Sequence, residues 1–162
     1  MIYITGDCHG NFERFNPSIF PEQNEMTKED YVIICGDFGG VWNGKNEEKY
    51  WLNWLKNKNF TTLFIDGNHE NFDMLKNFEI ADLLGGKAQK IDDGIFHLMR
   101  GEVYNIDKKK IFAFGGAKSH DKEYRTEGIS WWKEEIPSAE EYENARKNLE
   151  KNGWKVDYII TH

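Results

Sequence analysis

The length, composition and charge of the chain are those of one globular domain. Its 162 residues are predicted to form a single domain (1–162), and 39% apolar residues, with 15% aromatic ones, can fill a core and exclude disorder as the dominant state. No apolar run approaches the ~20 residues of a membrane span. No secretory leader is visible, and two cysteines cannot form a disulfide scaffold, so we expect a cytoplasmic protein without a membrane partner. The net charge of −7 disfavours nucleic acid, which remains an alternative partner.

Strands are predicted where short apolar runs end in glycine followed by an acid or an amide. This pattern recurs in Ile2–Asp7, Tyr31–Asp37 and Thr62–Asn68. Two related runs are Ile111–Gly116 and Val156–His162, of which the second ends on a histidine. Continuous apolar runs of this length, rich in β-branched and aromatic residues, predict strands that are covered on both faces.

Two helices are predicted between these strands. The segment 46–58 has apolar residues at helical spacing, acids in its first turn and lysines in its last. The second helix follows an S-x-x-E capping box formed by Ser138 and Glu141, and Asn152-Gly153 supplies a left-handed stop.

The segment Lys87–Gly116 is predicted to form several strands joined by Asp-Gly, Arg-Gly and Asp-Lys turns. Strand–helix alternation followed by a cluster of strands predicts a mixed α/β fold with two stacked sheets. In open α/β sheets, functional sites lie in the loops that follow the carboxyl ends of the strands.

The side chains that can bind metals all follow predicted strands. They are Asp7, His9, Asp37, Asn68, His69, Glu70 and His162. The glycines before Asp7, Asp37 and Asn68 permit sharp turns at these points. Carboxylate, imidazole and amide groups together suit Mn²⁺, Fe or Zn²⁺, and a bridging carboxylate would create a two-metal site.

These residues resemble the motifs of the calcineurin-like metallophosphoesterases. The motifs are D-x-H (Asp7-Cys8-His9), G-D (Gly36-Asp37) and G-N-H-E (Gly67–Glu70), followed by a strand that ends in His162. The resemblance covers the whole chain, and residues 115–132 resemble a bacterial and phage branch of the family. It implies a four-layer α/β/β/α sandwich in which two mixed β-sheets are flanked by helices.

The resemblance also implies a role for each motif residue. The metal ligands would be Asp7 and His9 for the first ion, Asp37 as the bridge, and Asn68 and His162 for the second ion. His69 would protonate or stabilise the leaving oxygen. Apart from the resemblance, we expect Glu70 to orient His69, with Asp66 as an equally placed candidate. The expected cofactors are two divalent ions, with Mn, Fe or Zn favoured.

The chain departs from the family pattern at two points. No acid follows Asp37 within the run Asp37-Phe38-Gly39-Gly40, and no G-H-x-H segment follows His162. We therefore expect the natural protein to continue beyond His162, and the fold of this chain to be incomplete at the C-terminus. The chain itself would then be weakly active or inactive.

Outside the motifs, Lys118 and Arg125 are predicted to contact a substrate phosphate, although cationic loop residues are usually only solvated. His97 lies in an alternating run and is predicted to be a strand residue that is remote from the metals. The tryptophans are predicted to be mostly core residues.

The predicted function is metal-dependent phosphoester hydrolysis, in which a metal-bridging hydroxide attacks phosphorus in line. The substrate would be a small phosphoester or a nucleotide, and the patterns do not choose between a monoester and a diester or assign an oligomeric state. The alternative is a non-catalytic binding scaffold with the same fold. The joint presence of Asp7, His9, Asp37, Asn68 and His69 disfavours that alternative.

Overall fold

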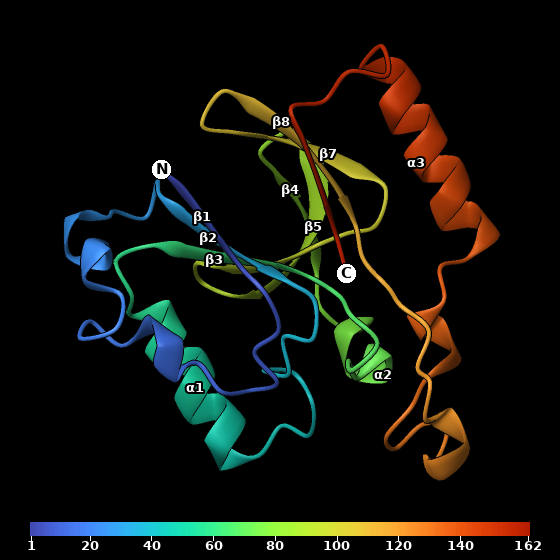
Figure 1. Cartoon of the computed structure of the whole chain (residues 1–162), viewed down its shortest axis with the longest axis horizontal. Coiled ribbons are helices and arrows are strands. Elements are labelled where there is room, and N and C mark those ends of the chain that lie inside the picture. Colours follow the sequence, from blue (N-terminus) through green and yellow to red (C-terminus); the bar gives the residue numbers. More distant parts are fainter.

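The computed structural model describes residues 1–162, which form two β-sheets flanked by helices (Figure 1). The six-stranded sheet consists, in spatial order, of β1 (Ile2–Thr5), β2 (Tyr31–Cys35), β3 (Thr61–Ile65), β6 (Ile95–Leu98), β5 (Gly86–Asp92) and β4 (Ile80–Leu83). The three-stranded sheet consists of β7 (Glu102–Ile106), β8 (Lys109–Phe114) and β9 (Tyr158–Thr161). The helices are α1 (Asn46–Lys56), α2 (Phe72–Leu75) and α3 (Ala139–Lys151), and none of them combines the length and apolar character needed to span a bilayer.

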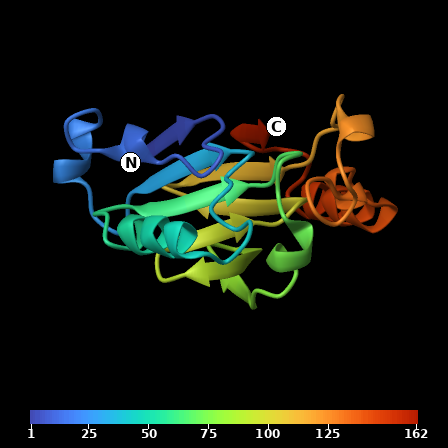
Figure 2. The same ribbon diagram turned by 90° about the horizontal axis from the view of Figure 1, so that it is seen from below.

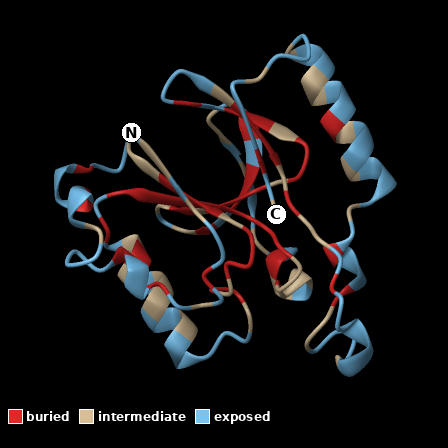
Figure 3. Cartoon of the chain, in the orientation of Figure 1, coloured by how far each residue is buried: buried red, intermediate tan, exposed pale blue.

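Three apolar clusters separate four layers, in the order α1, large sheet, small sheet and α3. Leu55 of α1 packs with Val32 and Phe64 on one face of the large sheet. The opposite face packs against the small sheet, and α3 covers the outer face of that sheet through Ala145. The buried residues accordingly concentrate in the strands, whereas the outer faces of α1 and α3 are exposed (Figure 3). These layers confirm the predicted α/β fold with two stacked mixed sheets.

The site is positioned by the parallel part of the large sheet. Strands β1, β2, β3 and β6 are parallel neighbours, so the loops after Thr5, Cys35 and Ile65 leave the sheet at one edge. Strand β9 runs parallel to β8, with Phe114 paired to Thr161. Strands β9 and β1 are the outermost strands of their sheets, on the same side of the molecule (Figure 2). His162, which follows β9, therefore lies near the loop after β1, at the carboxyl ends of the parallel strands.

Several elements differ from their predicted bounds. Helix α1 ends at Lys56, two residues before the predicted end, because Lys58 turns inward and its Nζ donates to the carbonyl of Phe15 at 2.7 Å. Strand β4 and the four-residue helix α2 were not predicted. Strand β4 is a short edge strand whose Ala81 and Asp82 have low β-propensity, so its sequence carries little strand signal.

Helix α3 has the predicted capping box. The Ser138 hydroxyl accepts from the Glu141 amide at 3.2 Å, and the Glu141 carboxylate accepts from the Ser138 amide at 2.7 Å. The helix is followed by Gly153 with a φ of 64°, as the predicted left-handed stop requires. The two ends of the last helix are therefore encoded locally.

We expect Ser138→Ala to lower the free energy of unfolding by about 1 kcal/mol, because the Glu141 amide loses its acceptor. Urea unfolding followed by circular dichroism measures the loss. Ser138→Thr is the control, since it keeps an oxygen in the capping position and should stay closer to the parent. Equal losses in the two variants would contradict the capping role.

Candidate metal centre

Asp37 joins the ends of three parallel strands. Its backbone carbonyl accepts from the amides of Cys8 and His9 at 3.1 and 2.8 Å, which ties the loop after β1 to the loop after β2. Its carboxylate Oδ1 accepts from the amide of His69 at 2.8 Å, which adds the loop after β3. A single buried aspartate therefore holds together the three segments that carry the sequence motifs.

The backbone is locally strained at the residues that meet here. His9 and Asp37 are not glycines, yet they have φ values of 49° and 46°, in the sparsely populated left-handed region. The neighbouring glycines make space for the site. A Cβ on Gly67 would overlap the carboxylate of Asp37, and a Cβ on Gly36 would overlap the ring of His162. The glycines of the G-D and G-N-H-E motifs are thus required by close approach as well as by turn geometry.

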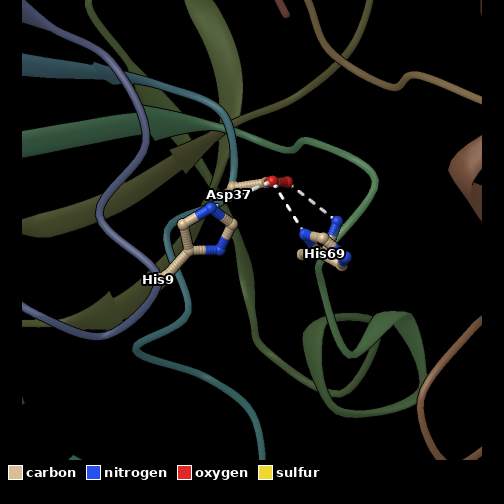
Figure 4. A group of neighbouring side chains, drawn as sticks. All are labelled: His9, Asp37 and His69. Carbon is tan, nitrogen blue, oxygen red and sulfur yellow. Dashed lines mark hydrogen bonds and ion pairs between the residues drawn. The ribbon is translucent and has the colours of Figure 1, made fainter. Parts of the chain in front are cut away.

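The spacing of the ligand atoms fits shared metal ions. His9 Nε2 lies 3.6 Å from Asp37 Oδ2 and 3.7 Å from Asp7 Oδ2, too far for a hydrogen bond. Donor atoms bound to one ion at about 2.1 Å lie roughly 3.4 Å apart in a tetrahedral shell. Two groups of side chains have all their ligand atoms within 4.8 Å of one another: His9, Asp37 and His69, and Asp7, Asp37 and His162. Figure 4 shows that the two histidines of the first group flank the Asp37 carboxylate.

The ring of His162 is oriented for ligation by a backbone carbonyl. Its Nδ1 lies 2.9 Å from the carbonyl oxygen of Cys35, and because a carbonyl only accepts, Nδ1 carries the proton. The lone pair of Nε2 then faces Asn68 Oδ1 at 3.3 Å and Asp37 Oδ1 at 3.6 Å. A histidine whose second nitrogen is held in this way is typical of metal ligands.

His69 is oriented by Asp37. Its Nδ1 lies 3.1 Å from Asp37 Oδ2, and the carboxylate accepts this hydrogen bond. The ring of His9 lies edge-on to it, with 5.3 Å between the centroids. The second ring nitrogen of His69, Nε2, is left without a hydrogen-bond partner from the chain and is available for other chemistry.

A pocket of about 480 Å³ opens beside the cluster. His9, His69 and Arg125 line it, together with the aromatic residues Phe12, Trp42 and Trp51. Lys118 is exposed and is not among the lining residues. The structure therefore brings one of the two predicted phosphate-contacting residues, Arg125, to the same pocket as the histidines.

The comparison with known families agrees with this geometry. The family model of the calcineurin-like phosphoesterases matches residues 1–161. The chain belongs to this family. Lariat debranching enzyme A of Xenopus laevis is 33% identical over 84 residues, which are 43% of this chain but 16% of that relative. No solved structure matches the chain. The family is one of phosphoesterases that use divalent metals, so the predicted family and the general class of cofactor are confirmed.

The hydrogen-bond partner of the His69 ring is Asp37, and not Glu70 or Asp66, which were predicted as candidates to orient it. The carboxylate of Glu70 is fully buried, and its Oε1 accepts from the amide of Phe38 at 2.7 Å. Burial, together with repulsion from Asp66 and Asp37, raises the pKa of the Glu70 carboxyl well above its usual value. Glu70 thus braces the turn after Asp37, and the residue that orients His69 is Asp37 itself.

Asp66 is the centre of a buried polar network beneath the site. Its carboxylate accepts from Arg100 Nε at 2.8 Å and lies 3.0 Å from His97 Nε2. The guanidinium of Arg100 also donates to Glu141 at 3.0 Å, at the start of α3. His97 is therefore a strand residue apart from the metal cluster, and the network links the end of β3 to α3.

Two groups that bind the predicted ligands were not indicated by the sequence. The Cys35 carbonyl, which orients His162, is a backbone group without any side-chain signature. Ser119 accepts from Asn68 Nδ2 at 3.1 Å across 51 residues of sequence. The sequence shows that Ser119 follows two glycines at the end of a predicted strand, but it does not show that Asn68 is the partner of Ser119.

We expect the stability contributed by Asp66 to depend on pH. Burial by itself would raise the pKa of its carboxyl, but the hydrogen bond and charge of His97, with those of Arg100, outweigh burial and hold the pKa below its usual value. This contribution is fully present above the pKa of about 3.9 in the unfolded chain and is lost as the pH falls through the lower folded value.

Asp66→Asn should cost about 3 kcal/mol at pH 7, because Arg100 loses its buried counter-charge. The measurement is the free energy of unfolding in urea for both proteins at pH 7, 5 and below 4. The difference between them should shrink at the acidic end. A difference that stays constant across the series would be incompatible with this ionised network.

Proposed function

We propose that the chain hydrolyses phosphoesters with two divalent metal ions. The first ion would be held by Asp7, His9 and Asp37, and the second by Asp37, Asn68 and His162. The observation that carries this proposal is that Asp37 belongs to both groups of close-lying ligand atoms described above, one with His9 and His69 and one with Asp7 and His162. Asp7 Oδ2 also lies 3.7 Å from His9 Nε2, and for this reason we assign Asp7 to the first ion. A carboxylate shared by two clusters is what a bridging ligand requires.

The bound metals would supply a Lewis acid for the phosphoryl oxygens and lower the pKa of a coordinated water. The chain's own contribution is to orient the groups around them. Asp37 fixes the ring of His69 through Nδ1. In its imidazolium form His69 also carries a proton on Nε2, and from the wall of the pocket it would donate this proton to the leaving oxygen.

Arg125 is the residue we assign to the substrate phosphate. It lines the pocket beside His9 and His69, and Asp121 holds its guanidinium at 2.7 Å. A planar guanidinium can bind two phosphate oxygens at once. Lys118 has no such position, so the proposal for phosphate contact rests on Arg125.

The bridging role of Asp37 can be tested by metal binding. Titration of the metal-free protein with Mn²⁺, followed by calorimetry, should show two sites of unequal affinity. The proposed ligands of the first ion include two carboxylates, whereas those of the second ion include one carboxylate and the neutral amide of Asn68. The second site should therefore bind Mn²⁺ more weakly. Asp37→Asn should weaken both sites, because it removes the shared charge.

Asn68→Ala is the matched variant and should weaken only the second site. The informative comparison is how far each variant lowers the Mn²⁺ affinity of the first site and of the second site. If Asp37→Asn left one of the two sites at its parental affinity, Asp37 would not be the bridge.

Hydrolysis can be tested with aryl phosphomonoesters and aryl phosphodiesters in the presence of Mn²⁺. Turnover of either class supports the enzyme, and the faster class identifies the substrate type. Metal binding without turnover of either class would instead support the alternative of a binding scaffold.

His69→Ala should lower kcat by about 10²–10⁴-fold. A proton donor matters most when the leaving oxygen is basic, so the loss should be larger for a phenyl ester than for the matching nitrophenyl ester. Measuring kcat for both esters with both proteins gives the comparison. The same loss for the two leaving groups would show that His69 does not act as the acid.

A further inference from the structure

The amide of Asn68 has to be oriented before it can bind a cation. Its oxygen has lone pairs that can bind a metal ion, whereas its NH₂ group has only hydrogens to offer. The two ends of the amide are nearly equal in shape, so packing alone discriminates weakly between them. In this structure Oδ1 faces His162 and Nδ2 faces away, toward Ser119.

Hydrogen bonding fixes this orientation through a buried serine and glutamate. Asn68 Nδ2 lies 3.1 Å from Ser119 Oγ, and Ser119 Oγ lies 2.6 Å from Glu135 Oε2. The amide of Ser119 donates to the other oxygen of the same carboxylate at 2.9 Å. Ser119 and Glu135 are 3% and 1% exposed, so water does not compete for these bonds.

The direction of each bond follows from what each group can donate. The Ser119 hydroxyl donates its single proton to Glu135 Oε2. The hydroxyl oxygen is then left as an acceptor, and Asn68 can satisfy it only with Nδ2. The reversed amide would place two acceptors, Oδ1 and Oγ, against each other. In the observed orientation Asn68 Oδ1 and His162 Nε2 are also two acceptors, 3.3 Å apart, and a cation bound by both would satisfy them.

We propose that Ser119 and Glu135 are positioning residues that hold the Asn68 carbonyl oxygen toward the second metal ion. The inference rests on the proposed function, because it assigns a purpose to the orientation of a proposed ligand. Residues that orient a metal ligand through its other end typically change metal affinity by about 10–100-fold when they are removed.

The surrounding backbone holds this pair in place. The loop after β8 is fixed to the end of β3 because the amide of Gly116 donates to the carbonyl of Asp66 at 2.9 Å. Gly115 has no room for a Cβ beside Asp66. The turn that carries Glu135 is held by Arg100, which donates to the carbonyl of Glu134 at 2.9 Å. The Asn68–Ser119–Glu135 relay is thus built on the same buried network that holds Asp66 at the end of β3, two residues before Asn68.

The first test is a double-mutant cycle on Mn²⁺ affinity, measured by calorimetry on the full chain. Ser119→Ala keeps the backbone bond to Glu135 but removes the hydroxyl, and should weaken the second site by about 10-fold or more. In an Asn68→Ala background the same change should alter Mn²⁺ affinity by less than about twofold, because Ser119 has nothing left to orient. A similar loss in both backgrounds would make Ser119 a merely structural residue and would overturn the inference.

Ser138→Ala is the matched control for this cycle. It also removes a serine hydroxyl that accepts from the protein, but it lies at the start of α3. It should lower stability and leave Mn²⁺ affinity unchanged. An equal fall in affinity in Ser138→Ala and Ser119→Ala would trace the effect to stability and count against the relay.

The second test needs no metal and separates this inference from the proposed function. In the metal-free protein, the side-chain NH₂ resonances of Asn68, assigned by their absence in Asn68→Ala, should show nuclear Overhauser contacts to the β protons of Ser119. In Ser119→Ala these resonances should shift and exchange faster with water. If the Overhauser contacts between Asn68 and Ser119 are present but no second Mn²⁺ site is found, the proposed function alone is overturned. If these contacts are missing, the relay is overturned whether or not Mn²⁺ binds.

Discussion

The close approach of three strand ends around the Asp37 side chain is the constraint on which the site depends. The backbone carbonyl of Asp37 accepts from amides of the loop after β1, and the Asp37 carboxylate accepts from an amide of the loop after β3. Asp37 has a left-handed backbone, and a Cβ at position 67 would overlap its carboxylate. Local strain of this kind persists only where the surrounding structure over-determines it, and here two parallel neighbours of β2 do so.

Buried carboxylates surround this point, and each is held by a different kind of donor. Asp66 binds Arg100 and faces His97, Glu70 binds the backbone after Asp37, and Glu135 binds Ser119. A buried ion pair taken as a whole contributes little net stability, since desolvation offsets its attraction, although the loss of one partner leaves a costly unpaired charge. The common effect of these carboxylates is geometric, because each one fixes a loop or side chain that leads to the metal ligands.

The two sides of the cluster differ in their exposure. His9 and His69 line the open pocket with Arg125, whereas Asn68 and His162 are held from behind by Ser119 and the Cys35 carbonyl. On the proposed function, a substrate would approach from the pocket that His9 and His69 line. His69 and Arg125 on the pocket side would then meet the phosphoester, whereas Asn68 and His162 would hold a metal ion.

Local patterns in the chain were sufficient for the strands other than β4, the two long helices, the capping box of α3 and the family motifs. These features depend on residues close together in sequence, such as the glycine and acid that follow each apolar run. The same patterns could not supply β4, whose residues are weak strand formers, or the partner of His69, which was expected to be Glu70 or Asp66 and is Asp37. Nor could they supply Ser119 and Glu135 beside Asn68. Such contacts join residues up to 51 positions apart, and they exist because parallel strand ends and the loop after β8 converge at one edge of the sheet. Chemistry at each position is a property of its residue, but which groups donate to which is decided by the packing that brings them together.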